Sequence, residues 1–289
     1  MTGTWTRRCA FAVLALLIAG CSSLLLGIAN VAARNEPVTR TPGIPYGTDG
    51  HQSLDVHVPK TTSAGGAPVM VFVHGGAWDA GSKEDYRFVG AALATRGYVA
   101  VVPGYRIYPK VRFPLFVEDA AQAVAWARTH AAEYGGDPRR LFLMGHSAGA
   151  HIVMLLALDE HYLQAAGMSS SDLRGVIGLS GPYDFYPFSS GFQHAVFDFG
   201  GDPLLTQPIH FVRGNAPPIL LLYGSADKVV DPQNSARLAD ALRSAGSPVT
   251  IKVYPNVSHG DTVAAFSKLK SHRPPVIEDI DAFVIAVTR

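Results

Sequence analysis

Cysteine and charged residues are both scarce in this chain. Of its 289 residues only two are cysteines, Cys9 and Cys21, and 16% are charged. Two cysteines near one end exclude a disulfide framework and a cysteine-based metal site in the rest of the chain. Lys and Arg number 24 against 23 Asp and Glu, and a formal net charge of +1 gives no electrostatic basis for binding nucleic acid.

Sequence repeats, Pro/Gly-rich linkers and several well-known motifs are also missing. The chain has no H-E-x-x-H, no C-x-x-C and no P-loop, so we expect no metal and no cofactor. The chain is rich in apolar residues, since 48% of its residues are hydrophobic. That content excludes disorder as the dominant state, and the length suits one large domain with a full core.

The N-terminus has the pattern of an export signal. Arg7 and Arg8 precede an apolar run over residues 11–20, as in secretory signal peptides. The run ends in Ile-Ala-Gly-Cys at 18–21, which resembles the bacterial lipobox. We therefore predict a signal peptide over 1–20 and lipidation at Cys21 as the first mature residue. The protein would then be anchored to the bacterial cell envelope, in the outer membrane if the source is Gram-negative.

Two other interpretations of the N-terminus stay open. Residues 10–33 are long and apolar enough for an uncleaved transmembrane anchor. Alternatively, residues 24–33 form the first helix of the folded domain. We treat 21–45 as an anchor or lead-in and 46–289 as a single domain. The sequence leaves the oligomeric state undetermined.

Short apolar runs alternate with helical patterns along the rest of the chain. Expected strands cover 54–58, 68–73, 98–102, 141–144, 176–179, 219–223 and 249–254. Expected helices cover 83–96, 115–134, 148–158, 232–245 and 276–287. This alternation predicts an α/β fold with a mainly parallel, twisted sheet and helices on both faces. Such sheets place their chemistry in the loops at the carboxyl ends of the strands.

A candidate nucleophile stands at one of these ends. Gly145-His-Ser147-Ala-Gly149 fits the G-x-S-x-G motif, directly after the strand 141–144 and directly before a helix. In so sharp a turn, side chains two residues either side of Ser147 would collide with backbone, and the two glycines avoid this. The turn would lift the serine hydroxyl above the sheet at a helix N-terminus, where the dipole favours negative charge.

A glycine-rich loop follows the neighbouring strand 68–73. The sequence of this loop is His74-Gly75-Gly76-Ala77-Trp78. Acyl transfer needs backbone N–H groups aimed at the carbonyl oxygen as it becomes an oxyanion, and glycines let the backbone present them. The N–H of Ala148 would be the second arm of this oxyanion hole. We expect His74 to brace the loop rather than to catalyse.

A serine nucleophile also needs a histidine to take its proton and a carboxylate to orient that histidine. Asp227 follows the strand 219–223 and His259 follows the strand 249–254, on the same edge as Ser147. Asp231 is the rival acid, but it stands at a helix start, where capping is its expected role. His272 is the rival base, away from any strand end.

Together these motifs resemble the α/β-hydrolase superfamily, in particular its carboxylesterase-like branch with an H-G-G-x-W loop. That branch includes bacterial carboxylesterases, feruloyl and acetyl-xylan esterases, kynurenine formamidases and prenylcysteine methylesterases. The resemblance covers residues 45–289 and implies the order nucleophile, acid, base. It also implies oxyanion donors at Gly75 and Gly76. Ala77 departs from the related H-G-G-G loops, so which of the three residues donate stays open.

The resemblance implies a serine hydrolase that cleaves small acyl or aryl esters through an acyl-enzyme. An arylformamidase or amidase on the same triad is the alternative, and a non-catalytic binding protein is the remote one. We expect substrate choice to lie in a short aromatic cap segment, 182–215, with Trp78, Tyr183 and Phe185 lining the pocket. Half of the aromatic residues in this segment are expected to be simple core packing. The natural substrate is not determined by these patterns.

Overall fold

The computed structural model describes residues 26–61, 65–269 and 273–289. Within them lies one sheet of eight strands in the order β1-β2-β4-β3-β5-β6-β7-β8. The strands are β1 (Val38–Pro45), β2 (Ser53–Pro59), β3 (Ala67–Val73), β4 (Val99–Pro103), β5 (Gly136–His146), β6 (Leu173–Leu179), β7 (Ile219–Gly224) and β8 (Val249–Tyr254). Strand β2 runs antiparallel to both of its neighbours, and all other pairings are parallel. The predicted mainly parallel sheet is thereby confirmed.

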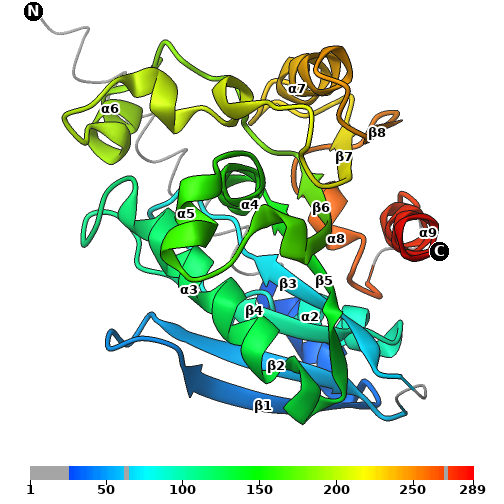
Figure 1. The fold of residues 1–289 in the computed structure, drawn as a ribbon. Helices are drawn as coiled ribbons and strands as arrows, with labels where there is room; N and C mark the ends of the chain where they lie inside the picture. Colours follow the sequence, from blue (N-terminus) through cyan, green and yellow to red (C-terminus); the bar gives the residue numbers. More distant parts are fainter. Residues whose placement is uncertain (1–25, 62–64, 270–272) are drawn as a thin grey trace, which may run out of the picture.

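Helices cover both faces of this sheet (Figure 1). The α-helices are α2 (Arg87–Thr95), α3 (Leu115–His130), α4 (Ala148–Leu158), α5 (Glu160–Ala165), α6 (Gly191–Phe197), α7 (Gln233–Ser244), α8 (Asp261–Ala264) and α9 (Val276–Thr288). The short 3-10 helices are η1 (Ala33–Asn35), η2 (Ala131–Tyr134), η3 (Ser170–Asp172), η4 (Pro203–Thr206) and η5 (Pro208–Phe211). The five helices expected from the sequence correspond to α2, α3 with η2, α4, α7 and α9.

Two buried clusters hold the layers together, one on each face of the sheet. Along β3, Val69 and Val71 point to the cluster that contains α3, α4 and α7, while Met70 and Phe72 point to the one with α2, α8 and α9. All four side chains are fully buried. Continuous apolar strands are what a sheet covered on both faces requires, because successive side chains point to opposite faces.

The sheet begins before residue 46, where the sequence placed the start of the domain. Strand β1 lies on the edge of the sheet and pairs only with β2. Ahead of it, residues 26–32 are helical, and Asn30 donates two side-chain hydrogen bonds to the carbonyls of Glu84 and Asp85. The Asn30 side-chain oxygen accepts the N–H of Phe88. This segment therefore packs on the folded body, as one of the open interpretations had it.

The other N-terminal predictions are not tested. The predicted signal peptide 1–20, Cys21 and the rival base His272 all lie outside the described residues. In the part of the chain that the structure does describe, no helix combines the length and the apolar character needed to cross a membrane. Lipidation at Cys21 and an envelope location stay predictions from the sequence.

The segment 182–215 lies beyond the strand ends, between β6 and β7. It holds α6, η4 and η5, and it is drawn in yellow-green at the top of Figure 1, above α4. The ring nitrogen Nε2 of His151, on α4, donates to the carbonyl of Thr206 over 2.8 Å. This buried bond ties the cap segment to the helix that follows the candidate nucleophile.

Candidate active site

Ser147 occupies the sharp turn between β5 and α4. Its backbone has φ 54° and ψ −119°, a conformation that a non-glycine residue rarely adopts and that is held only by its surroundings. A Cβ on Gly145 would lie 2.2 Å from the carbonyl oxygen of Gly149, and one on Gly149 would lie 2.0 Å from that of Val73. Both glycines are thus sterically required, for the reason that the motif predicted.

The predicted acid and base meet in the structure. His259 Nδ1 lies 2.8 Å from Asp227 Oδ2. The other carboxylate oxygen of Asp227 accepts the N–H groups of Val229 and Val230, both at 2.9 Å. Because the carboxylate accepts, Nδ1 carries the hydrogen and Nε2 keeps the lone pair needed to take a proton from serine.

Burial and hydrogen bonding shift the pKa of the Asp227 carboxyl in opposite directions. Its side chain is 1% exposed, and burial alone would raise the pKa of the carboxyl. The hydrogen bond and charge of His259, with the amides of Val230 and Val229, more than offset that and hold the pKa below its usual range. Asp227 is therefore an ionised orienting group at neutral pH.

The rival acid has a different role. Asp231 has a side chain that is 61% exposed, and its Oδ1 accepts the N–H of Gln233 at the start of α7. Asp231 therefore bonds the first turn of α7 from just before its N-cap, Pro232, in line with the helix-start role that the sequence assigned to it.

The glycine loop after β3 lies against the nucleophile. A Cβ on Gly75 would come within 3.2 Å of Ser147 Cβ, so no side chain fits between them. His74 is buried, donates from Nδ1 to the carbonyl of Gly75 over 2.8 Å, and stacks on Tyr105 with ring centroids 4.3 Å apart. The Tyr105 hydroxyl donates to the carbonyl of His74. His74 braces the loop, as expected.

The predicted oxyanion donors belong to the glycine loop and to the start of α4. Gly75 lies directly against His146 and Ser147, and Ala148 is the first residue of α4. The amides of Gly75, Gly76 and Ala77 all stay candidates within the loop, as the sequence left them.

Two of the three predicted pocket residues come together. The rings of Trp78 and Phe185 stack with centroids 5.8 Å apart, and Trp78 meets His151 edge-on at 5.3 Å. Tyr183 does not join them: its side chain is fully buried, and its N–H donates to Asn234 Oδ1. Tyr183 is a core residue, because a side chain without exposed surface cannot line an open pocket.

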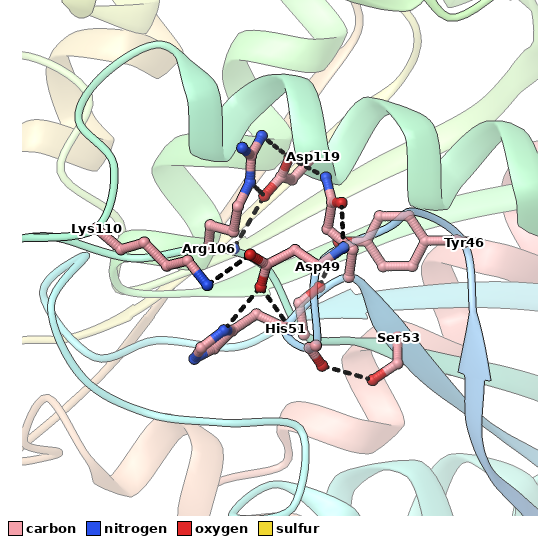
Figure 2. Close-up of polar contacts among 10 residues, drawn as sticks. Tyr46, Asp49, His51, Ser53, Arg106, Lys110 and Asp119 are labelled. Atoms are coloured by element: carbon pink, nitrogen blue, oxygen red, sulfur yellow. Dashed lines mark hydrogen bonds and ion pairs between the residues drawn. The ribbon is translucent and has the colours of Figure 1, made fainter.

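A polar network supports the loop after β4 (Figure 2). The buried carboxylate of Asp119 accepts the Arg106 guanidinium at 2.6 and 2.8 Å, the N–H of Arg106 at 2.9 Å and the side-chain amide of Gln52 at 2.7 Å. Tyr46 donates to the carbonyl of Gly104. Because Tyr105 lies between these anchored residues, the network also holds the residue on which His74 stacks.

Removal of the Asp119 carboxylate should destabilise the fold. Asp119→Ala leaves Arg106 and Gln52 without their acceptor, and we expect a loss of about 3 kcal/mol in the free energy of unfolding. Asp240→Ala removes an ion pair with Arg243 in which the Asp240 side chain is 76% exposed, so it should cost less than about 1 kcal/mol. Urea unfolding of both variants measures the difference, and equal losses would contradict the role of the network.

The sequence matches a family model and is similar to curated esterases. The BD-FAE family model matches residues 54–242. The chain is 29% identical to the isoprenylcysteine alpha-carbonyl methylesterase ICME of Arabidopsis thaliana, over 84% of this chain and 61% of that protein. It is 31% identical to the esterase LipC of Mycobacterium tuberculosis, over 74% of this chain and 58% of that protein. The chain thus spans less than two thirds of the length of these curated relatives.

Solved structures share the fold. Thermogutta terrifontis esterase 2 superposes with a TM-score of 0.72 at 24% identity, covering 87% of this chain and 95% of that one. Esterase B from Lactobacillus rhamnosis gives a TM-score of 0.77 at 22% identity, covering 96% of this chain and 94% of that one. The architecture described above is the α/β-hydrolase fold.

Proposed function

Because the chain belongs to the BD-FAE family and carries a serine, a histidine and a buried carboxylate at one edge of its sheet, we propose that the protein is a serine hydrolase that cleaves carboxylic esters. The observation that carries the proposal is the 2.8 Å bond between His259 Nδ1 and Asp227 Oδ2, with the ring of His259 4.9 Å from that of His146, the residue that precedes Ser147. The names of the relatives, esterases and methylesterases, support the same chemistry.

The proposed reaction uses these three residues. His259, oriented by Asp227, takes the proton of Ser147 as the serine oxygen attacks the ester carbonyl. The amide of Ala148 and amides of the glycine loop, among those of Gly75, Gly76 and Ala77, hold the developing oxyanion. The tetrahedral intermediate expels the alcohol, which takes the proton from His259, and water hydrolyses the acyl-enzyme by the same route.

We propose that the preferred substrates are esters of small acyl groups. We assign the acyl side of the site to Phe185, whose ring is only partly buried and stacks on that of Trp78 with centroids 5.8 Å apart. The ring of Phe197, 1% exposed, packs behind both at 4.8 and 5.2 Å, and the buried His151, one turn after Ser147 on α4, packs on the same rings. Aromatic rings packed this closely leave little room for a long acyl chain beside the nucleophile.

Hydrolysis of p-nitrophenyl acetate, butyrate, octanoate and palmitate tests this proposal. We expect kcat/KM to be at least about tenfold higher for the two short esters, since a methylene that does not fit costs on the order of 1–3 kcal/mol. Phe185→Ala, which opens the aromatic wall, should move the preference toward octanoate. Turnover of N-formylkynurenine without turnover of any ester would replace the esterase assignment with a formamidase.

A further inference from the structure

His146 lies between the base and the oxyanion loop, and the reaction above gives it no role. It directly precedes Ser147, and its ring meets that of His259 with centroids 4.9 Å apart at 45°. Its Nε2 lies 3.2 Å from the carbonyl oxygen of His259. A Cβ on Gly75 would lie 3.0 Å from its Nδ1. One side chain, on the last residue of β5, therefore lies against the loop that follows β3 and the loop that follows β8.

The hydrogen bond of His146 fixes its tautomer. A carbonyl oxygen only accepts, so Nε2 carries the hydrogen and donates it to His259. Nδ1 is then a buried lone pair without a hydrogen-bond partner among the described residues. Burial first, and the neighbouring His259 second, lower the pKa of His146 to about 3. His146 thus stays neutral when the imidazole of His259 becomes charged during the reaction.

The carbonyl of His259 has a second donor. Thr262 Oγ1 donates to it over 3.0 Å, and Ser180 Oγ lies 3.1 Å from Thr262 Oγ1. The main chain of His259 is thus held from two sides, by His146 on β5 and by Thr262 on α8, while Asp227 holds the ring at Nδ1. A histidine that must meet a serine hydroxyl within hydrogen-bond reach needs this kind of support, because small displacements are costly.

We propose that His146 is a positioning residue, which places the base relative to Ser147 by donating its Nε2–H to the main-chain carbonyl of His259. The inference rests on the proposed function, since it presupposes that His259 activates Ser147. It assigns a role to the second residue of the G-x-S-x-G motif, at which the motif itself allows any residue.

Four variants test the role. His146→Leu removes the donor, His146→Gln keeps an N–H at the reach of Nε2, and His146→Asn keeps a polar side chain too short to reach the carbonyl. His57→Leu is the matched control: His57 lies on β2, is 2% exposed, and neither of its ring nitrogens has a partner among the described residues. Each variant is assayed for kcat and KM with p-nitrophenyl butyrate, for the rate of Ser147 labelling by a fluorophosphonate, and for its melting temperature.

We expect His146→Leu and His146→Asn to lower kcat and the labelling rate together, on the order of 10- to 100-fold, with KM changed less than about threefold. His146→Gln should recover most of the loss, and His57→Leu should keep kcat within about twofold. If His146→Leu does not fold, the comparison of His146→Gln with His146→Asn tests the proposal. Unchanged kcat in a folded Leu or Asn variant, an equal loss in Gln and Asn, or a loss confined to KM would overturn the proposal.

Fluorophosphonate labelling of the wild-type protein distinguishes a failure of this proposal from a failure of the proposed function. A wild-type protein that neither hydrolyses esters nor reacts with the fluorophosphonate would refute the serine hydrolase assignment. A wild-type protein that does both, with variants of His146 equally active, would refute only the positioning role.

Discussion

Replacing Ser147 with alanine is expected to abolish ester hydrolysis, with kcat lowered about a millionfold. Without the hydroxyl no acyl-enzyme forms, and only the oxyanion donors and substrate binding remain to accelerate the reaction. The fold should not suffer, because alanine experiences the same strain as serine at φ 54°. Initial rates with p-nitrophenyl butyrate and the burst of nitrophenol in the first turnover measure the effect.

Ser82→Ala provides the control for this substitution. It removes a hydroxyl that donates to Asp85 in the loop before α2, outside the catalytic residues. We expect its kcat to stay within about twofold of wild type. A Ser147→Ala variant that keeps its burst and more than a few per cent of the rate would show that the observed turnover has another origin.

Replacing Asp227 with asparagine should lower kcat on the order of 10⁴-fold. The asparagine amide can donate to Nδ1 of His259, which then carries its hydrogen on Nε2 and cannot accept the proton of Ser147. The amides of Val229 and Val230 still find an oxygen acceptor, so the loop keeps its bonds. The loss should therefore appear in kcat, with the melting temperature little changed.

Asp231→Asn is the matched control, because both aspartates lie in the loop between β7 and α7. Asparagine caps a helix about as well as aspartate, so we expect activity within about twofold of wild type. Comparable losses in the two variants would mean that the loop, rather than the bond to His259, matters. A loss in Asp231→Asn alone would move the acid to position 231.

Local patterns were sufficient to predict most of the fold and to place the candidate triad residues at the ends of strands. The seven predicted strands are apolar runs or half-buried alternations, and all are present as β2 to β8. Strand β1 was missed because it lies on the sheet edge, carries Pro42 and Gly43, and has a register shift between Thr41 and Ile44. Edge strands of this kind lack the continuous apolar signal on which strand prediction depends.

Aromatic residues in the cap were harder to assign. Tyr183 and Phe185 are two residues apart in the same segment, yet one is fully buried and the other packs on Trp78. Sequence gives both the same expectation, because a large apolar ring suits a core and a pocket equally well. Only the packing of the cap against α4 and α7 separates them, through contacts such as that of Tyr183 with Asn234.

The sequence by itself determined the candidate site: a serine between two obligatory glycines, and an acid and a histidine after later strands, in an order that fits an acyl-transfer triad. It could do so because these signals are local, set by the steric limits of a turn and by the ends of strands. Only the tertiary structure shows that the carboxylate of Asp227 contacts His259 while that of Asp231 bonds the start of α7, and that the ring of His146 reaches the carbonyl of His259. These contacts join residues up to 113 positions apart in the chain, which no local pattern encodes.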